Sequence, residues 1–518
     1  MKLAVSSMIS KIDNFSAKNL GLSVKDLMEK SGIVVADAVR TRVKGGESVI
    51  VLAGKGNNGG DGYAAAVSLM DEYDLLVIDV LGKGQKNEAG RYFMELYKSR
   101  GGRVEMYEPT EELHHLIKTS ACVIDAVFGT GFVGEMPESI RPLAITVREA
   151  VGTRKIAIDV PLGINPDDGS VSSDFVISVE ATVALSFIKP GIISYPARAF
   201  VGEIIYDSLG LPEKEIDENF NFKYHMVDTD FVKGVLPKRE ENSNKGTFGK
   251  LLLITGSEKY RGAAHLSAEA ALRGGVGLVT FAGCEQLLSE LSIKYPEMIF
   301  HKTSSVSQIS DEEIKTLCTL SQKHTATVIG SGSDNTEGLL KLTLDLLATE
   351  GGILILDADA INSLSSLGEK GIIAIKEAKR NVIITPHPLE FARFIGDEVA
   401  NVQLHRLEKA EKFAKENNAI VVLKGASTIV TDGENVYINS TGSSALSKAG
   451  SGDVLAGFMG AMCAQKSMSD ALAATLSVYL HGAAGDALAN KYSSYGVTPS
   501  DLPKEIACQI AHIFNEEC

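Results

Sequence analysis

Short apolar runs alternate with longer amphipathic stretches along almost the whole chain. The runs are rich in Val, Ile and Leu, and each is followed by a glycine-rich loop and a stretch of helical periodicity. Such runs are typical of parallel strands that are buried on both faces and joined by helices. They occupy residues 48–54, 74–80, 121–129, 155–160, 250–256, 326–330, 352–360, 381–388 and 419–425. The pattern therefore predicts an α/β protein.

A polar segment separates these runs into two sets. Residues 208–245 are rich in charge, Asn and Pro and have no clean apolar period, and residues 212–222 are expected to form an exposed connector. We therefore predict two domains, residues 1–216 and 217–518. A helix is expected early in the first domain, because residues 20–43 place apolar side chains at i, i+3 and i+4.

The composition narrows the class of protein. The chain has 518 residues, 44% of them apolar and 23% charged, as in a packed globular protein. Its 51 Lys and Arg against 66 Asp and Glu give a net charge of −15, which disfavours a nucleic-acid partner. No segment approaches the ~18 apolar residues of a membrane span. We expect a cytoplasmic protein with no membrane partner, and a homo-oligomer formed through the helical amino-terminal arm.

Polar loops follow the predicted strands of the first domain. Residues 54–62 (GKGNNGGDG) precede a helical stretch, so backbone amides there can hold an anion, while Asn57, Asn58 and Asp61 can bind hydroxyls or a cation. Asp125 and Asp159 each end a strand, and strand ends meet at one edge of a parallel sheet. The alternatives are an ordinary connecting loop, and aspartates that only cap helices.

The strongest signal in the second domain is Gly450-Ser451-Gly452. A helix is expected to start near Asp453, so the free amides of its first turn can stabilise a transferring phosphoryl group. Asp453 can accept the proton of an attacking hydroxyl. The alternative is that Asp453 caps the helix and the glycines only permit close packing.

Three further loops in this domain carry polar groups. Residues 424–428 (KGAST) offer a cation and two hydroxyls between two strands, which suits a nucleotide, although an ordinary hairpin has the same pattern. His387 lies between two prolines and is either a ligand-binding or a structural histidine. Asp357, Asp359 and Asn362 follow another strand and can orient a substrate or Mg²⁺.

Four motifs of the first domain recur in order in one known family. GKGNNGGDGYAAA, DAVFGTGF, AIDVPLGI and FIKPG, within residues 1–210, resemble the NAD(P)H-hydrate epimerase domain. The resemblance implies a Rossmann-like three-layer α/β sandwich that interconverts the R and S hydrates, with bound K⁺. It also implies that Asp159 is a candidate for proton transfer and that Lys189 participates. The residues implied to contact the hydrated dinucleotide are Asn57, Asn58, Gly59, Gly60, Asp61, Gly129, Thr130, Gly131, Phe132, Val133, Gly134, Glu135 and Asp159.

The implied potassium ligands are Asn58, Asp125 and the residue at position 162. The family has a serine at this last position, whereas this chain has Leu162, which offers only its backbone carbonyl. We therefore expect weak or absent stimulation by K⁺.

The second domain is similar to the ADP/ATP-dependent NAD(P)H-hydrate dehydratases, which are ribokinase-like α/β proteins. The matching segments include KGTFGK, GSEKYRGAA, TPHPLE, VVLKGASTIV and NSTGSSALSKAGSGDVL. The resemblance implies ADP-driven dehydration of the S hydrate with release of AMP and phosphate, ADP or ATP as co-substrate, and Mg²⁺. It places Ala263, Gly332, His387 and Asp453 at the dinucleotide, and Lys424, Gly425, Ala426, Ser427, Thr428 and Gly452 at the adenine nucleotide.

The combined prediction is a bifunctional enzyme that repairs hydrated nicotinamide nucleotides, with Asp453 and Asp159 as its catalytic residues. Three alternatives stay open. The second domain could be a small-molecule kinase of the ribokinase or hydroxymethylpyrimidine type, since such a kinase uses the same glycine-rich loop. The first domain could be a binding module without activity, or an NAD-dependent oxidoreductase built on Gly54 to Gly59.

Overall fold

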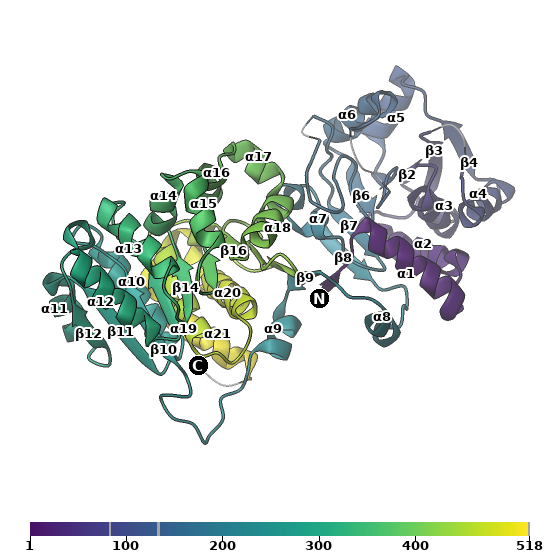
Figure 1. The fold of residues 1–518 in the computed structure, drawn as a ribbon. Coiled ribbons are helices and arrows are strands. Elements are labelled where there is room, and N and C mark those ends of the chain that lie inside the picture. Colours follow the sequence, from purple (N-terminus) through teal and green to yellow (C-terminus); the bar gives the residue numbers. More distant parts are fainter. Residues whose placement is uncertain (82–83, 132–134, 173, 516–518) are drawn as a thin grey trace. The chain divides into compact units, whose positions relative to one another are not determined.

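A computed structural model describes residues 1–81, 84–131, 135–172 and 174–515. The chain forms two compact units, one of Lys2–Tyr224 and one of Met1 with His225–Cys518 (Figure 1). The expected domain boundary was after residue 216.

The described part of the first unit contains a seven-stranded, wholly parallel sheet in the order β4-β3-β2-β5-β6-β7-β8. Four of the predicted runs form β2, β3, β5 and β6. The prediction missed β4, which is mostly exposed, as well as β7 and β8. The strands of this unit are β1 (Lys2–Leu3), β2 (Ser48–Ala53), β3 (Asp74–Asp79), β4 (Arg103–Met106), β5 (Cys122–Ala126), β6 (Arg154–Ile158), β7 (Ala181–Leu185) and β8 (Glu203–Asp207).

Helices cover both faces of this sheet. Val49 and Val51 of β2 pack with the apolar side chains of α2, α3 and α4, whereas Ile50 and Leu52 pack with those of α5 and α6. Alternate residues of one strand are therefore buried on opposite faces, as the continuous apolar runs predict. The helices are α1 (Ser6–Asn19), α2 (Val24–Arg40), α3 (Asn57–Leu69), α4 (Glu88–Ser99), α5 (Glu111–Thr119), α6 (Arg141–Glu149), α7 (Pro190–Ile193) and α8 (Glu213–Asn219).

The expectation of an exposed connector at residues 212–222 is wrong in part. Helix α8 forms there, and Ile216 is buried in the same apolar cluster as α2 and α3. A single buried side chain in an otherwise charged segment gives no periodic signal, so the sequence pattern alone does not reveal this helix.

The sheet of the second unit includes strands in the order β9-β18-β17-β16-β15-β14-β13-β10-β11-β12. Strands β10 to β16 pair in parallel, whereas β17 and β18 pair antiparallel. Five predicted runs form β10, β13, β14, β15 and β16. The strands are β9 (Tyr224–Val227), β10 (Lys250–Ile254), β11 (Leu278–Gly283), β12 (Ile299–Lys302), β13 (Ala326–Ile329), β14 (Ile353–Leu356), β15 (Val382–Ile384), β16 (Ile420–Leu423), β17 (Ile429–Thr431) and β18 (Val436–Asn439).

Helices α10, α19, α20 and α21 contribute to the large apolar cluster on one face of this sheet. No helix in the described residues is both long and apolar enough to cross a membrane. The helices are α9 (Thr229–Val235), α10 (Arg261–Arg273), α11 (Glu285–Lys294), α12 (Asp311–Gln322), α13 (Glu337–Leu347), α14 (Asp359–Ser365), α15 (Glu369–Lys376), α16 (Pro388–Ile395), α17 (Val399–Leu404), α18 (Arg406–Asn417), α19 (Ser451–Ala464), α20 (Asp470–Gly496) and α21 (Leu502–Ile513).

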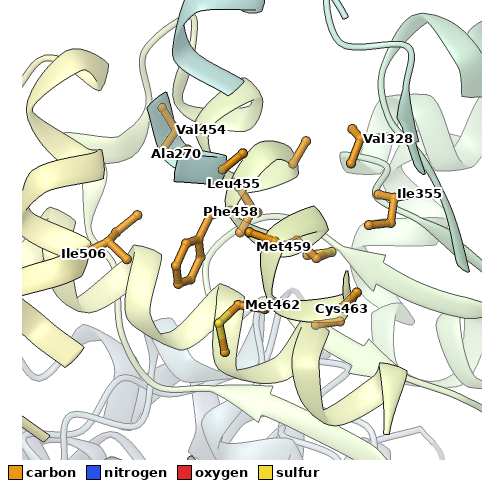
Figure 2. Close-up of a cluster of buried hydrophobic side chains, with 14 of the residues drawn as sticks. Ala270, Val328, Ile355, Val454, Leu455, Phe458, Met459, Met462, Cys463 and Ile506 are labelled. Carbon is orange, nitrogen blue, oxygen red and sulfur yellow. The ribbon is translucent and has the colours of Figure 1, made fainter. Parts of the chain in front are cut away.

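Helix α19 is buried on nearly all sides. Figure 2 shows Phe458 and Met459 of α19 among side chains from other elements, including Val328 of β13, Ile355 of β14 and Ile506 of α21. A helix that is apolar all round belongs in the interior of a protein. This packing fixes the start of α19, the segment that carries the strongest sequence signal.

Candidate active sites

The first unit contains a cavity of about 420 Å³. Its walls come from α1, α2, the start of α3 and the loops that follow β5, β6 and β7, so it lies at the carboxyl ends of the strands. The predicted residues that line it are Asn57, Asn58, Asp61, Gly129, Thr130, Gly131, Asp159 and Lys189. The structure thus brings together residues from four separate motifs.

The glycines of the first loop allow close packing. A Cβ atom on Gly54 would lie 1.9 Å from Val127 O, and one on Gly59 would lie 1.8 Å from Gly54 O. Gly60 packs against the side chain of Met28 in the same way. Gly59 and Gly60 are therefore buried, and they let the start of α3 pack closely against the loop after β2 and against α2.

Asn58 lies in the first turn of α3, where it is 7% exposed. Its Nδ2 donates a hydrogen bond to Phe128 O at 2.8 Å. Its Oδ1 is buried and has no hydrogen-bond partner among the described residues. A buried acceptor without a donor is costly, so this atom is suited to receive a ligand hydroxyl or a cation.

Asp125 is buried at the end of β5. One carboxylate oxygen accepts the amide of Val127 at 3.1 Å, and the other accepts the amide of Leu162 at 2.7 Å. Burial raises the pKa of Asp125 to about 7, although the two amide hydrogen bonds oppose the shift. Asp125 therefore does not cap a helix. It ties the loop after β5 to the loop after β6.

Leu162 is 1% exposed and belongs to the apolar cluster beside α5 and α6. Its carbonyl accepts the amide of Ile177 at 3.2 Å. The side chain at this position supplies no oxygen, and the carbonyl already has a donor. Only Asn58 and Asp125 of the three implied ligands thus offer side-chain oxygens, and this donor set fits K⁺ poorly because such cations favour many oxygen ligands.

Asp159 and Lys189 form an ion pair inside the cavity. Lys189 is 1% exposed, and its Nζ also donates to Leu185 O at 3.0 Å. Asp159 has a φ of +69°, which is uncommon for a residue with a side chain, and its amide donates to Val183 O at 2.8 Å. The strained backbone of Asp159 is held by β7 and turns its carboxylate to the lysine.

Two more carboxyl groups line the cavity. Burial, followed by the charge of Asp159, raises the pKa of Asp61 well above its usual value, against a hydrogen bond from Ser31. Asp13 of α1 was not among the predicted site residues. Burial raises its pKa to about 6, with Lys189 opposing and Asp159 supporting the shift. One acid in an amphipathic helix gives no signal in the sequence that separates it from a surface acid.

The remaining residues implied by the epimerase resemblance lie elsewhere. Glu135 is not among the described residues that line the cavity, its side chain is 96% exposed, and its carboxylate lies 3.8 Å from the guanidinium of Arg141. Phe132, Val133 and Gly134 lie outside the described residues.

In the second unit, the first turn of α19 presents its amides to the loops after β14 and β16. Gly450 precedes the helix with a φ of +101°, and the first intrahelical bond runs from the amide of Val454 to Gly450 O at 3.2 Å. The amides of Gly452 and Asp453 come before that bond and are left for an anion. Asp453 is the third helical residue and so does not occupy the capping position.

Asp357 and Lys424 form a buried ion pair beside this helix start. Lys424 Nζ lies 3.0 Å from Asp357 Oδ1, and the carboxylate also accepts from Thr385 Oγ1 at 2.6 Å and Ser331 Oγ at 2.8 Å. Burial alone would raise the pKa of Asp357, but the ammonium and the two hydroxyls outweigh it and lower the pKa. The carboxylate therefore stays ionised and holds Lys424 in place.

Asp453 lies close enough to this pair to be affected by it. Burial raises the pKa of Asp453 to about 7, the charge of Asp357 adds to the shift, and Lys424 opposes it. A Cβ atom on Gly452 would lie 3.7 Å from Lys424 Nζ, which places the lysine next to the free amides. The start of α19 thus combines a carboxylate that titrates near neutral pH with a cation and backbone donors.

The turn at residues 424–428 joins β16 to β17 as a hairpin. Arg406, which the sequence analysis did not select, is buried against it and donates to the carbonyls of Ala426, Leu423 and Lys424 at 2.6, 3.2 and 3.2 Å. A Cβ atom on Gly425 would lie 2.9 Å from this guanidinium. Within the turn, Thr428 Oγ1 donates to Gly425 O at 2.8 Å. Arg406 therefore fixes the shape of the loop that follows Lys424.

Ala263 and Gly332 are adjacent. A Cβ atom on Gly332, whose φ is +60°, would lie 2.6 Å from the Cβ of Ala263. Asn362, in contrast, accepts a hydrogen bond from Arg393 at 2.8 Å. The predicted loop after β13 is thus brought beside the start of α10.

His387 caps helix α16. Its Nδ1 accepts the amide of Glu390 at 3.2 Å, and the Glu390 carboxylate accepts the amide of His387 at 2.8 Å. Burial, with a contribution from Lys424, lowers the pKa of His387, although Glu390 opposes the shift. The ring is half-exposed, and its Nε2 lies 3.3 Å from a carboxylate oxygen of Glu390.

The fold and the two sites define a class of two-domain enzymes. Each α/β unit has a polar site at the carboxyl edge of its sheet. One site holds acids around a lysine, and the other holds a helix start that can bind an anion. Comparison with known proteins identifies the class further. Residues 24–191 match the family described as YjeF-related protein N-terminus, and residues 251–508 match the family described as NAD(P)H-hydrate dehydratase.

Relatives match this chain over almost its whole length. The chain is 31% identical over 490 residues to the bifunctional NAD(P)H-hydrate repair enzyme Nnr of Coxiella burnetii, covering 93% of this chain and 94% of that protein. The corresponding enzyme of Moorella thermoacetica is 29% identical over 524 residues, with 97% and 95% covered. The chain belongs to the family of bifunctional NAD(P)H-hydrate repair enzymes.

A solved structure also resembles the second unit. The ADP/ATP-dependent NAD(P)H-hydrate dehydratase from Bacillus subtilis, co-crystallized with ATP/Mg²⁺, is 27% identical, with 56% of this chain and 98% of that chain covered and a TM-score of 0.48.

Proposed function

We propose that the chain repairs hydrated NAD(P)H in two linked reactions. The first unit interconverts the R and S hydrates. The second unit dehydrates the S hydrate to NAD(P)H and converts ADP to AMP and phosphate. Family membership supports both activities, and the arrangement of Asp453, Lys424 and the amides at the start of α19 supports the phosphoryl-transfer step.

Dehydration needs an activated leaving group, because hydroxide leaves poorly from the reduced ring near neutral pH. Asp453 takes the proton of the ring hydroxyl, and the oxygen attacks the terminal phosphoryl group of ADP. The bond from that phosphorus to the bridging oxygen breaks, and AMP leaves. Asp453 is suited to this role because its pKa of about 7 matches a base that works near neutral pH.

The phosphate ester then departs with assistance from the ring-nitrogen lone pair. Loss of a proton from the neighbouring ring carbon restores the dihydronicotinamide. The amides of Gly452 and Asp453 and the ammonium of Lys424 stabilise the charge that develops on the phosphoryl oxygens. Asp357 keeps that ammonium in position through the 3.0 Å contact.

Mg²⁺ would arrive with the nucleotide and reduce the charge of its phosphates, as it usually does when substrate oxygens supply most of its ligands. Asp357 is not proposed as its ligand, since its oxygens already accept three hydrogen bonds. Asn362 is likewise engaged by Arg393. The chain's own part is to orient the phosphates by Lys424 and the residues 425–428.

In the first unit, the hydroxyl-bearing carbon is bonded to the ring nitrogen, and its configuration changes when water leaves one face and adds to the other. Asp159 is proposed to transfer a proton in this process, with Lys189 holding its carboxylate in position through their buried ion pair. We propose that K⁺ is not required, because Leu162 replaces a side-chain oxygen with a buried isobutyl group.

The observation that carries the proposal is the position of Asp453 in the first turn of α19, beside the Asp357–Lys424 pair. The test incubates the purified chain with R and S hydrates, with and without ADP, and follows each epimer by chromatography. Loss of S hydrate with formation of NAD(P)H, AMP and phosphate is expected only with ADP. R hydrate is expected to be consumed at the rate at which it forms S hydrate.

A small-molecule kinase would instead leave a stable phosphorylated product and no NAD(P)H absorbance. A first unit without activity would leave the R hydrate unchanged beyond its spontaneous epimerisation. Either result would contradict the corresponding half of the proposal.

A further inference from the structure

The titratable groups that line the cavity of the first unit are unbalanced in charge. They are three carboxyl groups, on Asp13, Asp61 and Asp159, and two lysines, Lys55 and Lys189. Lys189 is buried and paired with Asp159, whereas Lys55 lies on the loop before α3 and is partly exposed. Two carboxyl groups therefore share a cavity wall without a buried cation of their own.

These two acids differ in their partners. The hydroxyl of Ser31, which donates to Leu27 O at 2.9 Å, lies beside the carboxyl group of Asp61 and opposes the rise of its pKa. The carboxyl group of Asp13, by contrast, accepts no hydrogen bond from any residue that the structure describes, although it is half-buried in the cavity wall. Its position is well defined, because its neighbour Ile12 is fully buried in the core cluster and Ile9 and Ser10 line the same cavity.

A second polar group in the same wall points to a ligand. Asn58 is 7% exposed, and its Oδ1 has no donor among the described residues. A ligand hydroxyl is both a donor and an acceptor. A ligand hydroxyl can therefore donate to Asn58 while it accepts a proton from an acid that lines the same cavity.

We propose that Asp13 is a catalytic residue of the first unit and supplies the proton with which the ring hydroxyl leaves as water. This inference rests on the proposed epimerase function. The proton passes from the Asp13 carboxyl group to the hydroxyl oxygen, the carbon–oxygen bond breaks, and the ring-nitrogen lone pair forms a carbon–nitrogen double bond. Water then adds to the other face of the cation, the electron pair returns to nitrogen, and the proton that the water loses passes to Asp159. The reverse reaction uses the two carboxyl groups in exchanged roles.

The electrostatics of the cavity agree with these roles. Burial, and then Asp159, raises the pKa of Asp13 to about 6 against the effect of Lys189, so the group is half protonated near pH 6 and a minor fraction keeps the proton at neutral pH. Asp159 is held beside the ammonium of Lys189, which fixes the position of its carboxylate. Two acids in different environments thus provide an acid and a base in one cavity.

The test compares Asp13→Asn with Lys11→Gln, a charge change at an exposed position on the same helix. Conversion of pure R hydrate to S hydrate is measured against pH, with the spontaneous rate subtracted. Asp13→Asn is expected to lower kcat at least ~100-fold, the low end for general acid–base catalysis. In the unaltered chain, deprotonation of Asp13 is expected to lower the rate of epimerisation above pH ~6. Any residual activity of Asp13→Asn is expected not to show this decline. Lys11→Gln is expected to behave as the unaltered chain.

Dehydration of pure S hydrate by the second unit serves as the internal control, and it is expected to be unchanged in Asp13→Asn. Asp13→Glu, which keeps the acid, is expected to retain more activity than Asp13→Asn. An Asp13→Asn variant with normal kcat and pH profile, or a loss that Asp13→Glu shares equally, would overturn the inference while leaving the epimerase function intact. An unaltered chain that does not accelerate epimerisation at all would overturn both.

Discussion

The amide of Leu162 donates a hydrogen bond to Asp125 Oδ2 at 2.7 Å. This contact uses the backbone at a position where the epimerase family has a serine, while the leucine side chain is buried in the apolar cluster beside α5 and α6. Asp125 thus accepts backbone amides from two loops, those of Val127 and Leu162. The side chain at position 162 offers no oxygen ligand.

Leu162→Ser is expected to increase the stimulation of epimerisation by K⁺, because it adds a hydroxyl at the position whose amide already contacts Asp125. The measurement is the rate of R-to-S conversion in KCl against the same concentration of NaCl. Leu162→Ala is the matched control, since it removes the same apolar contact without adding oxygen. Both variants lose packing, by about 2–5 kcal/mol for a buried Leu→Ala change, so their folding is checked by thermal unfolding. Strong K⁺ dependence of the unaltered chain would contradict the argument.

Asp453→Asn is expected to reduce dehydration of the S hydrate at least ~100-fold, because the amide cannot accept the proton of the attacking hydroxyl. Binding of ADP, measured by calorimetry, is expected to persist, since Lys424 and the turn after it are unchanged. Asp230→Asn is the control, because Asp230 is also an acid in the first turn of a helix, α9, and is exposed. Near-normal turnover of Asp453→Asn would refute Asp453 as the base.

The sequence pattern predicts the sheets and the loops at their carboxyl ends, because buried parallel strands are continuous apolar runs and their ends carry glycine and acids. It therefore selects Asp125, Asp159 and Lys424, which the structure places at those ends, while the glycine motif selects Asp453 in the first turn of α19. A departure from a family motif, as at Leu162, is also visible in the sequence.

Contacts between elements that are distant in the chain are not visible in this way. Asp13 enters the cavity only because α1 packs beside the loops after β5 to β7, and no spacing in α1 indicates it. Arg406 belongs to an amphipathic helix, and its role at the turn after β16 depends on where α18 packs. His387 caps a helix and also has a half-exposed ring. Its two flanking prolines do not show, in the sequence, whether the residue caps a helix or only binds a ligand.

The rate of dehydration is expected to rise with pH up to about 7 and then to level off, because Asp453 accepts a proton only when it is ionised and its pKa is about 7. Asp357→Asn is expected to move this rise to lower pH, since the charge of Asp357 contributes to the raised pKa of Asp453. The measurement is kcat at saturating ADP over a range of pH, with Asp230→Asn as the control. A rise that stays in place in Asp357→Asn would show that another group titrates.

The raised pKa of Asp453 also has a consequence for stability. Folding raises this pKa from 3.8 to about 7, so the folded state binds the proton more tightly than the unfolded state. The resulting stabilisation is complete below pH 3.8 and is lost as the pH rises through about 7. Above that pH the folded chain must keep a carboxylate in a partly buried site beside Asp357.

Asp453→Asn removes this charge and is expected to unfold at a higher temperature than the unaltered chain above pH 7. The difference is expected to shrink as the pH falls toward 3.8, where the unaltered side chain is also neutral. Calorimetry can assign the relevant transition to the second unit as the one that ADP shifts. If Asp453→Asn were less stable than the unaltered chain above pH 7, Asp453 would support the fold. Its environment would then not be organised for proton transfer at the expense of stability.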